Sequence, residues 1–151
     1  MYKRILVPLD GSDTARFGLR EAIALAKEQK ATLRLLHVVG EFPIMLEMAT
    51  VEGYEKVRRG LLHRADAMLQ DAKALAAGLD VRAETSLREV KRGRVADAIV
   101  DEAKEAGCDL IAIGTHGRRG VSRALLGSDA ERVLRQSHVP VLLVRERADQ
   151  A

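Results

Sequence analysis

One stretch of the chain is rich in glycine, and its spacing is typical of a site that binds phosphate groups. The stretch starts with seven residues, Gly114-Thr115-His116-Gly117-Arg118-Arg119-Gly120. A second pair, Gly127-Ser128, begins ten residues after Gly117. Glycine lets the backbone approach an anion closely and adopt positive φ, and consecutive N–H groups can form a concave anion site. The spacing therefore predicts that this segment holds the phosphates of a nucleotide.

The residues around this stretch indicate how it would work and which known phosphate motifs it is not. A helix is expected to begin near Ser128, and its N-terminus would direct unpaired N–H groups and the positive end of its dipole at the same phosphates. Positive charge nearby could come from Arg118, Arg119 and Arg123. No Gly-Lys-Ser or Gly-Lys-Thr occurs, so a Walker A motif is absent. The first turn, Asp10-Gly11-Ser12-Asp13, lacks the dinucleotide fingerprint.

Short apolar runs alternate with helical patterns along the chain, which is the signature of βαβ units and a parallel sheet. The expected strands are residues 5–9, 33–39, 81–86, 109–113 and 139–144. Residues 41–50 are expected to form a connecting loop. Helices are expected after Ser12, along a face made of Tyr54, Val57, Leu61, Ala65, Met68, Ala72 and Leu75, from Val95 to Ala103, and from Ser128 with Ala130, Val133 and Leu134 facing inward.

These elements predict an α/β fold in one domain over residues 1–151: a Rossmann-like, doubly wound, open parallel sheet of five strands in the order 3-2-1-4-5, with helices on both faces. The run at 5–9 is continuously apolar, as expected for a strand covered on both faces. Partial alternation at 81–86 indicates a position nearer an edge. In this order strands 1 and 4 are neighbours where the winding reverses, and ligands bind beyond the carboxyl ends of such strands. The site is therefore expected between Asp10 and Gly114.

The glycine stretch and the strand sequences together resemble the ATP-binding branch of the universal stress protein family. The spacing Gly114-x2-Gly117-x9-Gly127-Ser128 is similar to the glycine motif of that branch. The similarity covers essentially the whole chain. Its other parts are Ile5-Leu6-Val7-Pro8-Leu9-Asp10-Gly11-Ser12, Leu36-His37-Val38-Val39, Asp109-Leu110-Ile111 and Val139-Pro140-Val141-Leu142-Leu143-Val144-Arg145.

The resemblance implies roles for particular residues and a particular ligand. Those expected around the nucleotide are Pro8, Leu9 and Asp10 at the end of the first strand, Val38 beside adenine, Ile113 in the ribose and base pocket, Gly114, Gly117, Gly127 and Ser128 on the ribose and phosphates, and Thr115, His116, Arg118 and Asp129 in the same segments. The implied ligand is ATP, or another adenine nucleotide, with Mg²⁺ that Asp10 could reach through water.

Three of these residues differ from the family or have a simpler explanation. Asp129 stands where family members commonly have an apolar residue, often Val. A carboxylate there favours the start of a helix, but it repels a triphosphate unless a metal ion lies between them. Ser128 and Glu131 have the spacing of a capping box, so helix capping alone could explain Ser128. Asp10 could simply form a turn.

The sequence therefore predicts an ATP-binding sensor or regulator of a stress response with little or slow hydrolysis, without an assigned catalytic or metal-ligating residue. Two alternatives remain. One is a slow ATPase, for which Asp10 and Asp129 are the candidate carboxylates near the γ-phosphate. The other is a nucleotide-free dimeric interaction module. In either case a homodimer is expected through residues 139–145, because an apolar edge strand invites pairing with another chain.

Composition narrows the expected partners and compartment. The net charge of +3 is a mild excess, and the 3% of aromatic residues argues against single-stranded nucleic acid, which needs stacking platforms. The one cysteine, Cys108, cannot form an intramolecular disulfide and is expected to be buried. No stretch approaches the ~20 apolar residues of a membrane span. We therefore expect a cytoplasmic protein, whose protein partner the sequence does not specify.

Overall fold

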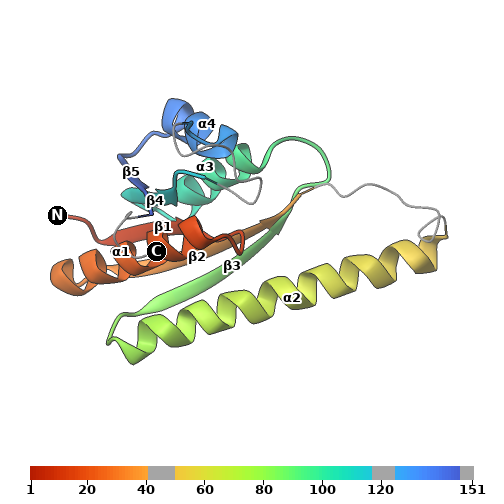
Figure 1. Cartoon of the computed structure of the whole chain (residues 1–151), viewed down its shortest axis with the longest axis horizontal. Coiled ribbons are helices and arrows are strands. Elements are labelled where there is room, and N and C mark those ends of the chain that lie inside the picture. The colour runs from red at the N-terminus through yellow and green to blue at the C-terminus, as the bar shows by residue number, and fades with distance from the viewer. Residues whose placement is uncertain (41–49, 117–124, 147–151) are drawn as a thin grey trace.

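The structure is a computed structural model that describes residues 1–40, 50–116 and 125–146. Helices and strands alternate along these residues (Figure 1). In chain order they are β1 Arg4–Pro8, α1 Asp13–Gln29, β2 Thr32–Val39, α2 Val51–Gly78, β3 Ala83–Glu89, α3 Val95–Glu105, β4 Leu110–Gly114, α4 Ser128–Gln136 and β5 Val141–Val144.

All the strands run parallel in one sheet, in the order β3-β2-β1-β4-β5. The predicted fold class and strand order are therefore confirmed. β1 lies at the reversal: Ile5 is the partner of Leu33 in β2 on one side and of Leu110 in β4 on the other. β3 and β5 are the two edges, as their sequences indicated.

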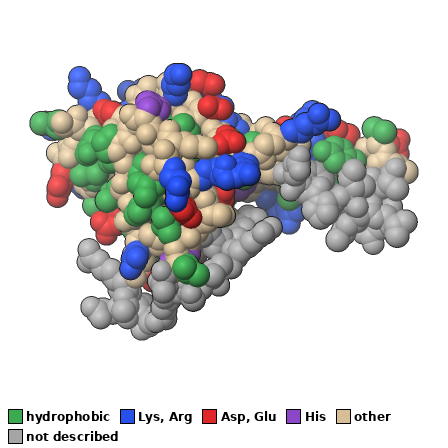
Figure 2. Space-filling view, turned by 90° about the horizontal axis from the view of Figure 1, so that it is seen from above, with side chains coloured by type: hydrophobic (Ala, Val, Ile, Leu, Met, Phe, Trp, Pro, Cys, Tyr) green, Lys and Arg blue, Asp and Glu red, His purple; other side chains and the backbone are tan. Residues whose placement is uncertain are grey.

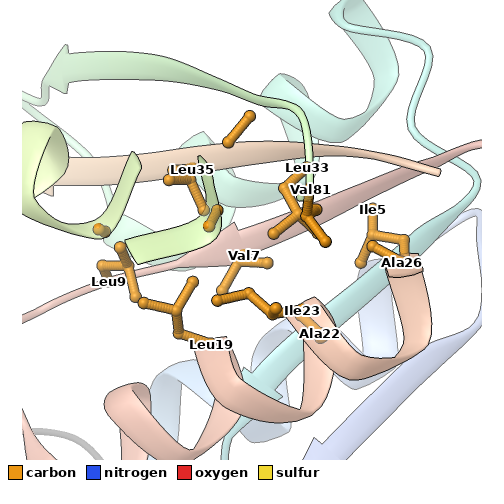
Figure 3. Packing of buried hydrophobic residues seen from close by; sticks show 14 of the residues in the cluster. Ile5, Val7, Leu9, Leu19, Ala22, Ile23, Ala26, Leu33, Leu35 and Val81 are labelled. Atoms are coloured by element: carbon orange, nitrogen blue, oxygen red, sulfur yellow. The ribbon is translucent and has the colours of Figure 1, made fainter. Parts of the chain in front are cut away.

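Each face of the sheet carries its own apolar core, so β1 is covered from both sides. On one face Ile5, Val7 and Leu9 pack against α1 (Figure 3), with residues of α2 in the same cluster. On the other face Leu6 and Ile111 pack against α3 and α4. Burial on both faces explains why the sequence of β1 is continuously apolar and does not alternate between apolar and polar residues.

The long helix α2 differs from its predicted face. Its buried residues are Ala65, Leu69, Ala72 and Ala76, whereas the predicted core positions Val57 and Leu75 are 36% and 45% exposed. α2 has 28 residues while β3 beside it has 7, and the N-terminal end of α2 extends past the sheet (Figure 1). The extension accounts for the exposure near the start of α2. Leu75 lies between Ala72 and Ala76, which are buried, so its exposure reflects the face of the helix that it occupies.

The other differences lie at the ends of elements. β3 runs over Ala83–Glu89 rather than 81–86, because the N–H of Val81 is still bonded to the carbonyl of Ala76 at the end of α2. β5 begins at Val141 rather than Val139, where a turn at Ser137 holds the preceding backbone. In α4, Leu134 is 46% exposed instead of facing inward. None of the helices in the described residues has the length and apolar character needed to span a membrane.

Candidate functional site

The carboxyl ends of β1 and β4 meet where the sheet reverses its winding. The register Leu6 to Ile111 puts Pro8, the last residue of β1, level with Ile113 near the end of β4. Asp10, two residues after Pro8, and Gly114, the last residue of β4, therefore lie at the same end of two neighbouring strands, which is where the topology predicts the site. Parallel α/β sheets place their ligands at such a reversal.

The turn after β1 is tightly specified by its own hydrogen bonds. The Asp10 carboxylate accepts the N–H of Ser12 at 2.9 Å, and Gly11 has φ of 84°, which only glycine adopts without strain. Ser12 then caps α1, because its hydroxyl oxygen accepts the N–H of Ala15 at 3.2 Å. Asp10 is thus a turn former, as the simpler interpretation held, and it stands at the crevice as well.

Gly114 allows β4 to approach the first turn of α1. A Cβ at this position would lie 2.8 Å from both the carbonyl carbon and the oxygen of Thr14 and 3.1 Å from the nitrogen of Ala15. These neighbours are backbone atoms, which cannot rotate away. The Thr14 hydroxyl donates to the carbonyl of His116 and so joins the same two segments. The first glycine of the motif is therefore required by packing, whatever it does for a ligand.

Thr115 connects the start of the glycine segment to two other elements. It is 2% exposed. Its N–H donates to the carbonyl of Val144 in β5 at 2.9 Å, and its carbonyl accepts the N–H of Gly127 at 2.7 Å. Its hydroxyl lies 2.9 Å from Nδ1 of His116. Thr115 thereby places the start of α4 beside the end of β4.

The start of α4 differs from the predicted capping box. Gly127 is the N-cap and no side chain caps it, while Ser128 is already the first helical residue. The hydroxyl of Ser128 therefore does not cap the helix, and the N–H of Glu131 is bonded to the carbonyl of Gly127. The first N–H groups of any α-helix have no partner within the helix, and no side chain in the described part of the chain caps Gly127. Such an end suits an anion.

Apolar and charged residues flank this arrangement. Ile113 is 7% exposed, and the side chain of Val38 packs against the same core cluster on the α3 and α4 face. Ser128 and Asp129 line an open hollow together with Arg94 and Arg132. In the described part of the chain, no three His, Cys, Asp or Glu side chains are placed to hold a metal ion.

The predicted site residues that the structure describes lie at the carboxyl ends of β1, β2 and β4, just after them, or at the start of α4. Gly117 and Arg118, with Arg119, Arg123 and the loop at 41–49, lie outside the described residues. Sequence reasoning missed Thr14 and His37, which hold the backbone of the crevice. The only signal for them was their position, since Thr14 opens a helix after the first strand and His37 lies near the end of the second.

Comparisons with known proteins agree with this geometry. The sequence model of the Universal stress protein family matches residues 1–145. The chain belongs to this family. It is 36% identical over 151 residues to the universal stress protein YxiE of Bacillus subtilis, covering 96% of this chain and 100% of that one. It is 35% identical over 146 residues to the universal stress protein MJ0531 of Methanocaldococcus jannaschii, covering 97% and 84%.

Solved structures show the same fold. The structure of MJ0577 from Methanocaldococcus jannaschii superposes with a TM-score of 0.84 at 29% identity, over 98% of this chain and 99% of that one. A universal stress protein solved in complex with cAMP superposes with a TM-score of 0.62 at 27% identity, over 95% and 98%. The five-stranded sheet with its helices is therefore the family's fold.

Proposed function

We propose that this protein binds an adenine nucleotide, ATP with Mg²⁺ being the ligand we favour, at the crevice between β1 and β4. The observation that carries the proposal is the meeting of two features at one place. The glycine segment leaves β4 there, and α4 begins there without a side-chain cap. A relative of the same fold was solved with cAMP, an adenine nucleotide.

The residues present suit the parts of such a ligand. Val38 is only partly buried and could contact the base, while Ile113 is 7% exposed and packs in the core cluster of the same face. The N–H groups at the start of α4 suit the phosphates. Asp10, whose carboxylate accepts the N–H of Ser12, could also contact water bound to Mg²⁺, an ion that usually keeps several waters beside one or two carboxylates and substrate phosphates. A bound Mg²⁺ could also offset the repulsion between the triphosphate and Asp129.

We further propose that the protein acts as a sensor rather than a catalyst. A ligand that binds only the folded protein stabilises it in proportion to its concentration. A change in nucleotide concentration would thus change the fraction of the protein that is folded and ligand-bound, or the surface that it offers to a partner. Hydrolysis would be slow. The alternative of a slow ATPase depends on Asp10 and Asp129 and would show as turnover that is lost when both are replaced by alanine.

The proposal predicts that Ser128→Pro weakens Mg-ATP binding by about tenfold or more. Proline is well tolerated as the first residue of a helix, and Gly127, with φ −60° and ψ 150°, already has the conformation that a residue before proline prefers. The substitution therefore removes the N–H of residue 128 with little effect on α4. A hydrogen bond to a charged group contributes roughly 1.5–3 kcal/mol. Isothermal titration on nucleotide-stripped protein measures the dissociation constant.

Ser128→Ala is the matched control, because it removes the hydroxyl and keeps the N–H. It should bind within a few-fold of the unaltered protein. If the alanine variant loses as much affinity as the proline variant, the hydroxyl and not the helix N-terminus holds the ligand. If the unaltered protein takes up no adenine nucleotide at millimolar concentration, the nucleotide proposal fails and the dimeric interaction module becomes the better explanation.

We also propose a homodimer through β5, residues 139–145. β5 is an edge strand with Leu142 37% exposed, and apolar side chains gather on the side of α3 and α4 at the end where β5 lies (Figure 2). A charge on an edge strand opposes pairing. Leu142→Lys should therefore give a monomeric mass by light scattering at tens of micromolar, as judged against the unaltered dimer.

The control for the dimer is Leu75→Lys, on the far side of the molecule in α2 and 45% exposed. It should leave the mass unchanged. A monomer for the unaltered protein, or a dimer that survives Leu142→Lys, would exclude this interface.

A further inference from the structure

The backbone of Leu9, just after β1, is held by β2 through both of its polar groups. Its N–H donates to the carbonyl of Leu36 at 2.7 Å, as a continuation of the sheet. Its carbonyl lies 2.5 Å from Nδ1 of His37. The N–H of Leu9 is thus bonded by backbone and its carbonyl by a side chain, at the point where the chain leaves the sheet.

This contact fixes which nitrogen of His37 carries hydrogen. A carbonyl oxygen can only accept a hydrogen bond, so Nδ1 of His37 must be the donor. The carbonyl of Leu9 belongs to the planar peptide that it shares with the nitrogen of Asp10. A ring that orients this carbonyl therefore also orients the backbone of Asp10, from which the turn through Gly11 to Ser12 continues.

We propose that His37 is a positioning residue for the nucleotide site: by donating from Nδ1 to the carbonyl of Leu9, it holds Asp10 and the turn after β1 in the conformation that binds the ligand. This inference rests on the proposed nucleotide function of the crevice. His37 need not contact the ligand itself. Its effect is to reduce the ordering that the turn would otherwise undergo on binding, which raises affinity by preorganisation.

Two substitutions separate this role from simple packing. The side-chain amide nitrogen of asparagine takes the place of Nδ1, so His37→Asn keeps the donor to Leu9. His37→Leu keeps a similar apolar volume and removes the donor. We expect His37→Leu to weaken Mg-ATP binding by about tenfold and His37→Asn to stay within about threefold of the unaltered protein.

Both variants are titrated by calorimetry at a temperature at which circular dichroism shows them fully folded. Amide hydrogen exchange of Asp10 and Ser12 in the ligand-free protein supplies a second readout, in which only His37→Leu should exchange faster. If His37→Leu binds as tightly as the unaltered protein, or His37→Asn is as weak as His37→Leu, the inference is wrong and the nucleotide proposal stands. If the unaltered protein does not bind Mg-ATP, the proposed function fails, and unchanged exchange at Asp10 would remove the positioning role as well.

Discussion

Replacing Glu102 by glutamine is expected to lower the free energy of unfolding by about 3 kcal/mol at pH 7, the lower end of the range for breaking a buried ion pair. Glu102 is 3% exposed. One carboxylate oxygen accepts from Nε of Arg34 at 2.8 Å, and the other accepts from Nε of Arg88. Glutamine keeps one acceptor and sets an N–H donor against an arginine. Urea unfolding followed by circular dichroism measures the loss.

The loss should depend on pH in a defined direction. Burial alone would raise the pKa of Glu102, but the hydrogen bonds from Arg34 and Arg88 outweigh it and hold the pKa below its ordinary value of 4.5. A carboxyl group whose pKa is lower in the folded protein contributes stability above the unfolded pKa and loses it as pH falls through the folded pKa. The difference between the two proteins should therefore be constant from pH 7 down to 5 and shrink below 4.5.

Glu105→Gln is the control for this prediction. Glu105 bonds the other end of the Arg88 guanidinium, but its side chain is 67% exposed. Exposed ion pairs contribute little, so the free energy of unfolding should change by less than about 0.5 kcal/mol. Equal losses for the two variants would mean that burial is not what makes the Glu102 contacts matter.

The second large effect is expected for Gly114→Ala, which should lower the free energy of unfolding by about 2 kcal/mol and weaken Mg-ATP binding by at least about tenfold. The added Cβ would lie 2.8 Å from the backbone of Thr14, so β4 and the first turn of α1 must move apart. Asp10 and the glycine segment border that contact. Thermal unfolding and titration calorimetry on the same preparation measure the two effects.

Gly18→Ala tests whether the effect is specific to this close approach. Gly18 lies inside α1 and faces the same segment, but its Cβ would be 3.5 Å from the nitrogen of Gly114, an ordinary contact. Alanine is favoured over glycine inside a helix by roughly 0.8–1 kcal/mol, so this variant should be as stable as the unaltered protein or more so. A stable Gly114→Ala variant with normal affinity would contradict the packing explanation.

The strand order could be predicted because it depends on features that sequence patterns carry. The continuous apolar run at 5–9 indicated a strand covered on both faces, and Ile5, Leu6 and Val7 are completely buried. The position of the crevice followed from the order. The buried face of α2 could not be predicted in the same way, because it depends on where the sheet ends beneath the helix. Val57, for example, has the helical spacing of a core residue and is nevertheless 36% exposed.

The glycines predicted where a site would lie, but they did not predict the contacts that the structure makes there. Gly114 is required by the backbone of α1, and no local pattern shows that Thr14 will lie against it. Ser128 had the spacing of a capping box, but the hydrogen bond from Gly127 to Thr115 starts the helix one residue earlier. Long-range contacts of this kind, like that between His37 and Leu9, depend on the register between strands, which a single sequence does not specify.

The hydrogen bond between the N–H of Gly127 and the carbonyl of Thr115 closes the base of the segment between β4 and α4. Thr115, at one end, donates its N–H to the carbonyl of Val144 in β5, and Gly127, at the other end, is bonded to Thr115. These bonds do not depend on the sequence that lies between the two ends. The entropy of closing a loop rises only slowly with its length. We therefore expect insertions and new sequences between these two ends to leave the sheet undisturbed, so that the proposed phosphate segment could change in length and composition on an unchanged scaffold.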